Sequence, residues 1–364
     1  MMKKEEQLLR IKKAFSYAKD TDVIVLINTE NMDPNFLYFT GLKNGLFEYS
    51  YLILEKYKAT LFTSSLEYET AIESVPEGMK VVKMDPSIDF RSEITAILKD
   101  KKVGTNDFFI PHGLYLLLMK RYNLKETIDV SEALSKARLI KDEVEIKSIK
   151  KAVSITKWAE MMIQKAFKEG ITEKELAAKF DQISASLGSD SPSFETIVCF
   201  GKNAALPHHF PDNTKLKKGD FILIDAGAKV DNYCSDITRT FIFGEQNGSD
   251  DYKAKLRMMK VVKDAQLRAI RAIKPGVKGS EIHKIAQDHI DTVDDGFYKG
   301  KFIHALGHSL GIEVHDGIGF SPGANQLLKP GMVITVEPGI YIPGFGGVRI
   351  EDDIVVTKDG VEVL

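Results

Sequence analysis

Cysteine is scarce in this chain of 364 residues, which has two, Cys199 and Cys234. Neither belongs to a C-x-x-C spacing, so the sequence implies no thiolate metal site and no disulfide framework. No window approaches the ~18 apolar residues of a membrane-spanning helix. The 50 basic and 52 acidic residues leave a net charge of -2, which gives no global field for binding nucleic acid or anionic membranes.

The first six residues, MMKKEE, contain no apolar stretch of the kind that signal peptides have. We therefore expect a cytoplasmic protein. With 43% hydrophobic and 28% charged residues the composition is that of a globular protein, and the length predicts two or three domains.

The first third of the chain alternates between strand and helix patterns. Strands are predicted at residues 23–27, 51–54, 60–63, 80–84 and near 102–103, with helices around 8–18, 65–74, 94–98 and 114–119. This alternation predicts an α/β domain with a covered sheet, which we assign to residues 1–130. It holds no chemical motif, and its lone histidine, His112, is interpreted as structural.

A second domain is predicted over residues 131–364. It opens with a long amphipathic helix in which apolar residues recur at spacings of three and four from Ala152 to Ala166, and Gly170 ends it. Thr172 and Glu175 then form a capping box for a further helix.

This second part contains a weak internal repeat. Residues 216–227 (LKKGDFILIDAG) match residues 328–339 (LKPGMVITVEPG), and residues 170–176 echo residues 276–282. Each half thus offers helices followed by an apolar strand that ends in a carboxylate. If the halves fold alike, Asp225 and Glu337 approach a common centre.

Two more acids follow at similar distances. Asp236 opens the alternating segment 236–243, and Glu351 lies in segment 348–355, so each reads as part of a return strand. Taken alone, an acid shortly before a glycine, such as Asp225 or Glu337, could simply start a turn. Four carboxylates that converge on one place would, however, repel each other at pH 7. Two divalent cations would balance their charge, and oxygen ligands with one imidazole suit Mn²⁺, Co²⁺, Fe²⁺ or Zn²⁺.

Candidate imidazoles are concentrated in two places. Segment 304–316 (HALGHSLGIEVHD) carries His304, His308 and His315, and a loop before the first acidic strand carries His208 and His209. His283 and His289 lie on a predicted amphipathic helix and are interpreted as structural.

Together these residues resemble the proline-specific metallopeptidases with the pita-bread fold, aminopeptidase P and prolidase; methionine aminopeptidases are more distant relatives. The resemblance rests on segments 205–209 (ALPHH), 225–228 (DAGA), 233–240 (YCSDITRT), 307–316 (GHSLGIEVHD), 336–341 (VEPGIY) and 347–352 (GVRIED) in this order, and on 35–41 (NFLYFTG) for the accessory domain. It implies a pita-bread catalytic domain of two related halves, preceded by an α/β domain like ribonuclease H. It also implies a homodimer that acts on proline-containing peptides.

The resemblance also implies roles for single residues. The metal ligands would be Asp225, Asp236, His308, Glu337 and Glu351, with Asp236 and Glu351 bridging two ions, Mn²⁺ or Co²⁺ and in some members Zn²⁺. His315 would donate to the oxyanion, Glu337 would move a proton and His208 would position the substrate. Thr238 and Arg349 would orient ligands, while Tyr233, Tyr341 and His304 would either line the pocket or serve packing.

The expected substrate preference depends on one difference between this sequence and the family pattern. In archaeal-type prolidases an arginine soon after the last histidine of the motif often holds the dipeptide's carboxylate, and residues 316–328 contain no arginine or lysine here. We therefore expect an aminopeptidase P activity, with Xaa-Pro dipeptidase (prolidase) as the alternative. A catalytically inactive pita-bread scaffold and a creatinase-like amidinohydrolase are the rivals from other classes, and metal content separates the peptidases from both.

Overall fold

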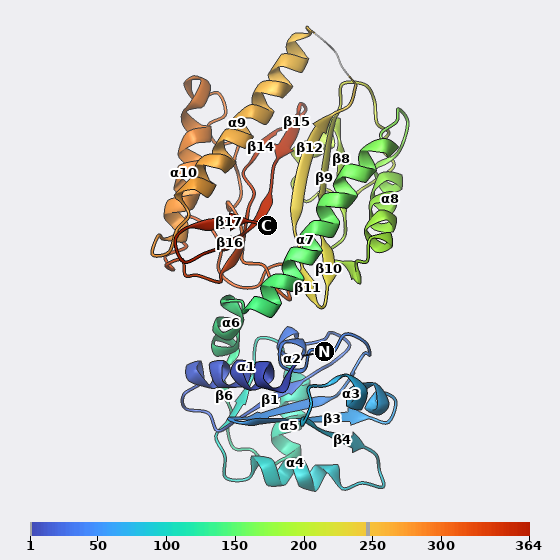
Figure 1. Cartoon of the computed structure of the whole chain (residues 1–364), viewed down its shortest axis with the longest axis vertical. Coiled ribbons are helices and arrows are strands. Elements are labelled where there is room, and N and C mark those ends of the chain that lie inside the picture. The colour runs from blue at the N-terminus through green and yellow to red at the C-terminus, as the bar shows by residue number, and fades with distance from the viewer. Residues whose placement is uncertain (1, 245–247) are drawn as a thin grey trace. The chain divides into compact units, whose positions relative to one another are not determined.

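The computed structural model describes residues 2–244 and 248–364, which form two compact units, Met1–Arg138 and Leu139–Leu364 (Figure 1). Within the described residues no helix is both long enough and apolar enough to cross a membrane.

The first unit is built on a mixed sheet with the strand order β4-β3-β2-β1-β5-β6. Strands β1, β2 and β3 are antiparallel neighbours, whereas β4, β5 and β6 join in parallel. The strands are β1 (Val23–Ile27), β2 (Tyr51–Glu55), β3 (Lys58–Ser64), β4 (Lys80–Met84), β5 (Val103–Thr105) and β6 (Ile128–Asp129). The helices are α1 (Lys4–Tyr17), α2 (Pro34–Thr40), α3 (Tyr68–Ser74), α4 (Phe90–Leu98), α5 (His112–Arg121) and α6 (Ser131–Leu139).

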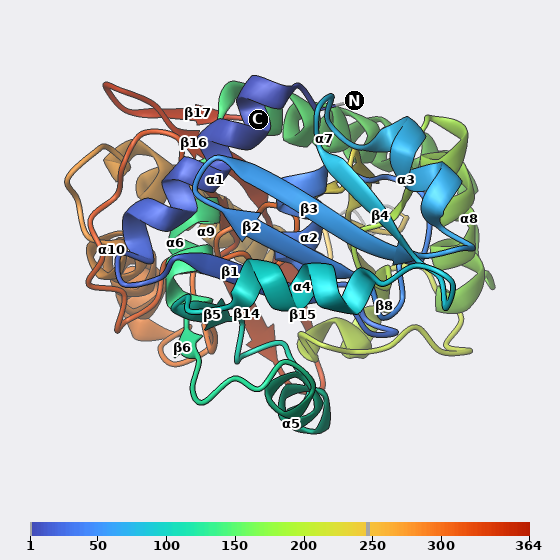
Figure 2. The same ribbon diagram turned by 90° about the horizontal axis from the view of Figure 1, so that it is seen from below.

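Both faces of this sheet are covered, which explains why its strands read as continuous apolar runs. Val23, Val25 and Ile27 of β1 form one core cluster with residues of α4 and α5, such as Leu98 and Leu118. Helices α1 and α2 lie on the opposite face, and Figure 2 shows the sheet from the side of α4 and α5. The predicted α/β character of this region is confirmed.

The first half of the second unit starts with a helix pair. Helix α7 (Glu143–Ile163) has a capping box made by Asp142 and Glu145, and α8 (Glu173–Ser186) has the predicted one made by Thr172 and Glu175. The strands that follow are β7 (Ser191–Pro192), β8 (Ile197–Phe200), β9 (Phe221–Ala226), β10 (Ala228–Val230), β11 (Tyr233–Cys234) and β12 (Ile237–Ile242). They form two sheets, β12-β9-β8 and β11-β10-β7.

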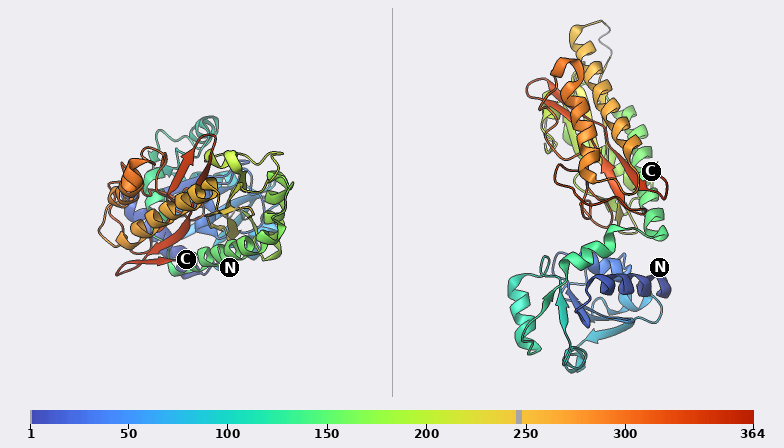
Figure 3. Two further views of the ribbon diagram at one scale, coloured as in Figure 1. Left: turned by 90° about the horizontal axis from the view of Figure 1, so that it is seen from above. Right: turned by 90° about the vertical axis from the view of Figure 1, so that its left-hand side faces the viewer.

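The second half repeats this plan with α9 (Asp250–Ala272) and α10 (Gly279–Thr292). Its strands are β13 (Val333–Val336), β14 (Gly339–Ile342), β15 (Gly346–Arg349), β16 (Asp352–Val356) and β17 (Val361–Val363). They form the sheets β13-β16-β17 and β14-β15. In Figures 1 and 3 the pairs α7–α8 and α9–α10 flank the strands of this unit from outside.

One sequence expectation needs correction. Segment 348–355 is not one return strand, because β15 ends at Arg349 and β16 begins at Asp352. The break lets the segment pair with β14 before Glu351 and with β13 after it. Glu351 therefore stands at a change of partner strand, between the two ladders.

Side-chain alternation on β9 shows how the halves are joined. Ile222 and Ile224 pack into a core cluster with α7 and α8, whereas Phe221 and Leu223 pack into the cluster that contains α9 and α10. Asp225 lies two residues beyond Leu223, on the face that looks towards the second half. The strand thus turns one carboxylate into the space between the halves.

Candidate metal centre and active site

Strand pairing brings the four acids together in two pairs. In the first half, β9 and β12 are antiparallel with Ala226 opposite Ile237, so that Asp225 and Asp236 lie at the same end of the pair. In the second half, Val336 is opposite Asp352, which places Glu337 and Glu351 beside each other in the same way.

A backbone hydrogen bond crosses between the halves at this point. The Glu351 N–H donates to the Thr238 carbonyl oxygen at 3.1 Å. The pair of acids from one half therefore faces the pair from the other half, as the internal repeat predicts.

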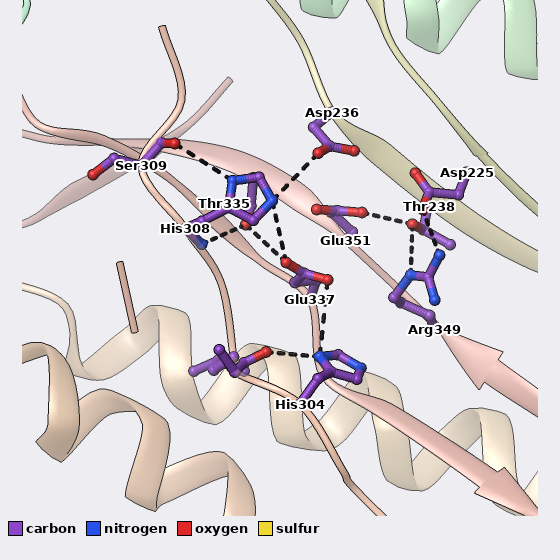
Figure 4. Close-up of polar contacts among 12 residues, drawn as sticks. Asp225, Asp236, Thr238, His304, His308, Ser309, Thr335, Glu337, Arg349 and Glu351 are labelled. Atoms are coloured by element: carbon purple, nitrogen blue, oxygen red, sulfur yellow. Dashed lines mark hydrogen bonds and ion pairs between the residues drawn. The ribbon is translucent and has the colours of Figure 1, made fainter. Parts of the chain in front are cut away.

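His308 completes this group from the loop before β13. Its Nε2 lies 3.4 Å from Asp236 Oδ2 and 3.4 Å from Glu337 Oε1 (Figure 4). Its Nδ1 faces the Ser309 carbonyl oxygen, and because a carbonyl only accepts, the proton belongs on Nδ1. The Nε2 lone pair is then directed at the acids, which is the arrangement a metal-binding histidine needs.

Three of these carboxylates each keep one oxygen without a donor. Asp225 Oδ1, Asp236 Oδ1 and Glu351 Oε1 are buried and have no hydrogen-bond partner within residues 2–244 and 248–364. Unpaired buried carboxylate oxygens are costly, and a cation removes that cost. Asp236, His308 and Glu351 each offer one ligand atom, and these atoms all lie within 4.8 Å of one another.

The same crowding shifts the protonation of the acids. Burial raises the pKa of Asp236 well above its usual range, and the carboxylates of Glu351 and Asp225 raise it further. Burial also raises the pKa of Glu351, again with help from neighbouring acids, and it raises the pKa of Glu337 to about 7. Burial lowers the pKa of His308 to about 4. A neutral imidazole among acids that resist ionisation fits a site for divalent cations.

Behind the acids, Arg349 and Thr238 hold two of the carboxylates from outside. Arg349 Nη2 donates to Asp225 Oδ2, and its Nε donates to Thr238 Oγ1 at 3.0 Å. The Thr238 hydroxyl in turn donates to Glu351 Oε2 at 2.6 Å. Asp225 and Glu351 thus each have one oxygen occupied, while the other oxygen has no partner among the described residues (Figure 4).

A pocket of about 400 Å³ opens onto this group. Its lining includes Asp225, Asp236, His308, Glu337 and Glu351 together with His208, His304, His315 and Arg349, and apolar walls come from Phe194, Ile197, Pro207, Ala305 and Val314. The volume and the apolar walls suit a small ligand such as a short peptide.

His304 is held by two hydrogen bonds that decide its tautomer. Its Nδ1 lies 2.7 Å from the Ala305 carbonyl oxygen, so Nδ1 carries the proton. Its Nε2 therefore accepts from the Tyr341 hydroxyl at 2.8 Å, and that hydroxyl oxygen accepts from Arg349 Nη1. Burial lowers the pKa of His304 to about 4, so the ring stays neutral.

His315 and His208 are more open to solvent than His304. The ring of His315 lies 4.1 Å from the ring of His308, centroid to centroid. Burial lowers the pKa of His315, with the nearby His208 as a further cause.

Of the two tyrosines singled out in the sequence, Tyr341 contacts the site and Tyr233 does not line the pocket. The hydroxyl of Tyr233, on β11, donates to Glu145 Oε1 of α7 at 3.1 Å.

Sequence reasoning missed Thr335, which supports both His308 and Glu337. Its hydroxyl accepts from the His308 N–H at 3.1 Å and donates to Glu337 Oε1 at 3.3 Å. The available signal was its place two residues from a candidate ligand, as with Thr238. It also missed the walls formed by Phe194, Ile197, Pro207 and Val314, for which the sequence holds no comparable signal.

A second group of possible ligands, Glu173, His209 and Asp212, has a structural explanation. Both oxygens of Glu173 accept hydrogen bonds, Oε1 from the Phe200 N–H and Oε2 from the Asp212 N–H and the His209 ring. No buried oxygen of Glu173 is left for a cation, and the group ties α8 to the loop before β9.

Comparison with known proteins agrees with this geometry. The model of metallopeptidase family M24 matches residues 147–358, and that of the creatinase/prolidase N-terminal domain matches residues 10–140. The Xaa-Pro dipeptidase of Pyrococcus horikoshii is 35% identical, and the match covers 98% of this chain and 96% of the relative; that of Pyrococcus furiosus is 36% identical, over 91% and 90%.

Solved structures are similar to this chain over almost its whole length. The Xaa-Pro dipeptidase from Bacillus anthracis superposes with a TM-score of 0.87 at 33% identity, covering 99% of this chain and 97% of that chain. The X-Pro aminopeptidase from Thermotoga maritima has a TM-score of 0.85 at 31% identity, covering 94% and 95%.

Proposed function

The chain belongs to metallopeptidase family M24, as a pita-bread proline-specific peptidase, and on this premise we propose that it is an Xaa-Pro dipeptidase that depends on divalent metal ions. The observation that carries the proposal is the meeting of four strand-end carboxylates and the Nε2 of His308 at the floor of one pocket. Hydrolysis of Xaa-Pro peptides is also the activity that the names of its relatives state.

The dipeptidase specificity is favoured by the relatives rather than by the sequence departure. Both Pyrococcus proteins and the Bacillus anthracis structure carry the dipeptidase name. The aminopeptidase P activity expected from the missing cation in residues 316–328 has less specific support, from the Thermotoga maritima structure. A clamp for the substrate carboxylate need not lie in that segment, because the exposed imidazole of His208 also lines the pocket and offers an N–H donor.

We assign Asp225, Asp236, His308, Glu337 and Glu351 as the residues that hold two metal ions. Mn²⁺ or Co²⁺ are the preferred ions, with Zn²⁺ as an alternative, because the donor set has mainly oxygen atoms and one imidazole nitrogen. When bound, such ions acidify water and polarise the peptide carbonyl group.

The remaining steps belong to side chains of this chain. The Glu337 carboxylate reaches into the pocket, where it would accept a proton from the attacking water and deliver it to the leaving proline nitrogen. His315, beside His308, would donate a hydrogen bond to the oxyanion that develops on the carbonyl oxygen. His208 would hold the substrate, and His304 would form a pocket wall with its Nε2 engaged by Tyr341.

The specificity is tested by giving the Mn²⁺-loaded protein an Xaa-Pro dipeptide and an Xaa-Pro-Xaa tripeptide side by side, with an EDTA control. We expect faster turnover of the dipeptide. Cleavage of the tripeptide alone would replace the dipeptidase proposal by the aminopeptidase one. The homodimer and the cytoplasmic location expected from the sequence stay predictions, and light scattering on the purified protein tests the first.

A further inference from the structure

A fully buried ion pair lies beside the pocket without being part of its lining. The side chain of Lys141 is 0% exposed and its Nζ lies 3.3 Å from Asp316 Oδ2, which is itself 2% exposed. Within the described part of the chain this ammonium group has no hydrogen-bond acceptor of good geometry. Its charge is therefore balanced through space by a carboxylate whose removal would leave it uncompensated in the interior.

Both partners are fixed to the backbone of the same unit. The Lys141 N–H donates to the Gly331 carbonyl oxygen at 2.8 Å, and the Asp316 N–H donates to the Ser309 carbonyl oxygen at 2.8 Å. The second bond closes the loop 309–316, which begins after the ligand His308 and ends after His315. The ion pair therefore sits where this loop closes.

The loop is packed against the ion pair without spare room. A Cβ atom on Gly311 would lie 1.9 Å from Asp316 Oδ2 and 2.9 Å from Lys141 Cε. The Gly311 carbonyl oxygen also accepts from the Cys234 N–H at 2.8 Å, which ties the loop to β11. A shift of Asp316 would thus displace the loop as a whole.

His315 depends on this support because its own ring is exposed to solvent. It faces the pocket 4.1 Å from the His308 ring, whereas the next residue, Asp316, is buried. An exposed side chain has few neighbours to hold it, so its position is set through the backbone.

We propose that Lys141 and Asp316 are positioning residues for His315, and that their ion pair fixes loop 309–316 so that this imidazole stays beside His308 over the reacting carbonyl group. The proposal rests on the proposed peptidase function and adds to it two residues that touch neither metal nor substrate. Displacement of a reacting group by about 1 Å costs on the order of 100-fold in rate.

The test uses full-length protein loaded with Mn²⁺ and the variants Asp316→Asn and Lys141→Met. We expect kcat for an Xaa-Pro dipeptide to fall on the order of 100-fold in each, with metal content unchanged and KM changed far less than kcat. The matched control is Lys150→Met, which removes a half-exposed lysine that pairs with Glu362 at 2.7 Å. It should keep the wild-type kcat.

The decisive measurement is a double-mutant cycle with His315→Ala. If the ion pair acts through His315, Asp316→Asn has no further effect on kcat when His315 is already alanine. If Asp316→Asn lowers kcat by the same factor in both backgrounds, the pair has only a general structural role and the proposal is overturned.

A fallback variant and the activity of the wild-type protein keep the test decisive. Should Asp316→Asn or Lys141→Met not fold, the double variant with both substitutions replaces them, since it leaves no uncompensated buried charge, and the same cycle with His315→Ala applies. A wild-type protein that cleaves no Xaa-Pro peptide would refute the proposed function, whereas an active wild type with an additive cycle refutes the positioning role alone.

Discussion

Thr238 and Thr240 allow a matched test of how the proposed metal ligands are held. Both lie on β12, both are buried, and both hydroxyls make two hydrogen bonds. Thr238 Oγ1 donates to the Glu351 carboxylate at 2.6 Å and accepts from the Arg349 guanidinium at 3.0 Å. Thr240 Oγ1 contacts only backbone, donating to the Arg349 carbonyl oxygen at 2.9 Å and accepting from its N–H at 3.2 Å.

Valine has the shape of threonine without its hydroxyl, so Thr238→Val and Thr240→Val each delete two hydrogen bonds with little change in packing. One bond of Thr238 joins it to the charged Arg349 guanidinium, so the free energy of unfolding should fall by about 3 kcal/mol, against about 2 kcal/mol for Thr240. Only Thr238→Val removes the hydrogen bond to Glu351, so the affinity of this variant for Mn²⁺ should fall about 10- to 100-fold.

Urea unfolding of the metal-free variants and calorimetric titration with Mn²⁺ measure the two effects separately. Thr240→Val should lose stability while it keeps the wild-type metal affinity. Equal metal affinities for the two variants would refute the reasoning that Thr238 orients Glu351 as a ligand.

Three other outcomes follow from the site. Asp236→Ala should lose bound metal and activity together, whereas His315→Ala should lose turnover and keep its metal, as elemental analysis beside an activity assay would show. Since burial raises the pKa of Glu337 to about 7, from about 4.3 unfolded, the metal-free folded state keeps a proton that the unfolded state has lost. Its stability should therefore fall by about 0.8 kcal/mol between pH 6.5 and pH 8 from this group, and Glu337→Gln should remove that part of the slope in urea unfolding. Gly227→Ala places a Cβ 1.9 Å from the Ser235 carbonyl oxygen and should lower the melting temperature, whereas Gly323→Ala, with open space around it, should not.

The sequence was sufficient to single out the proposed ligands because each of them has a local signature. An acid after an apolar strand, such as Asp225 after residues 221–224, is too costly to bury without a partner, and the second half repeats the pattern at Glu337. Those acids do meet, since both line the same pocket. Capping boxes and strand periods were equally local, which explains why α8 and β9 lie where they were predicted.

Other features depend on contacts between segments far apart in sequence. Whether Tyr233 or Tyr341 contacts the residues of the site is decided by partners 88 and 37 residues away, Glu145 and His304. The break before β16 follows from a change of partner strand. The substrate preference could not be predicted for a related reason, since a missing cation in residues 316–328 says nothing of side chains that other segments bring to the pocket.

The central claim is that metal ions held by these five residues enable the chain to cleave the bond before proline. The most direct test follows the hydrolysis of an Xaa-Pro dipeptide by EDTA-treated protein before and after Mn²⁺ is added, with Asp236→Ala in parallel. We predict no cleavage before addition, cleavage after it, and none with the variant. Cleavage that persists in EDTA, or no cleavage by the wild-type protein after Mn²⁺, would contradict the account.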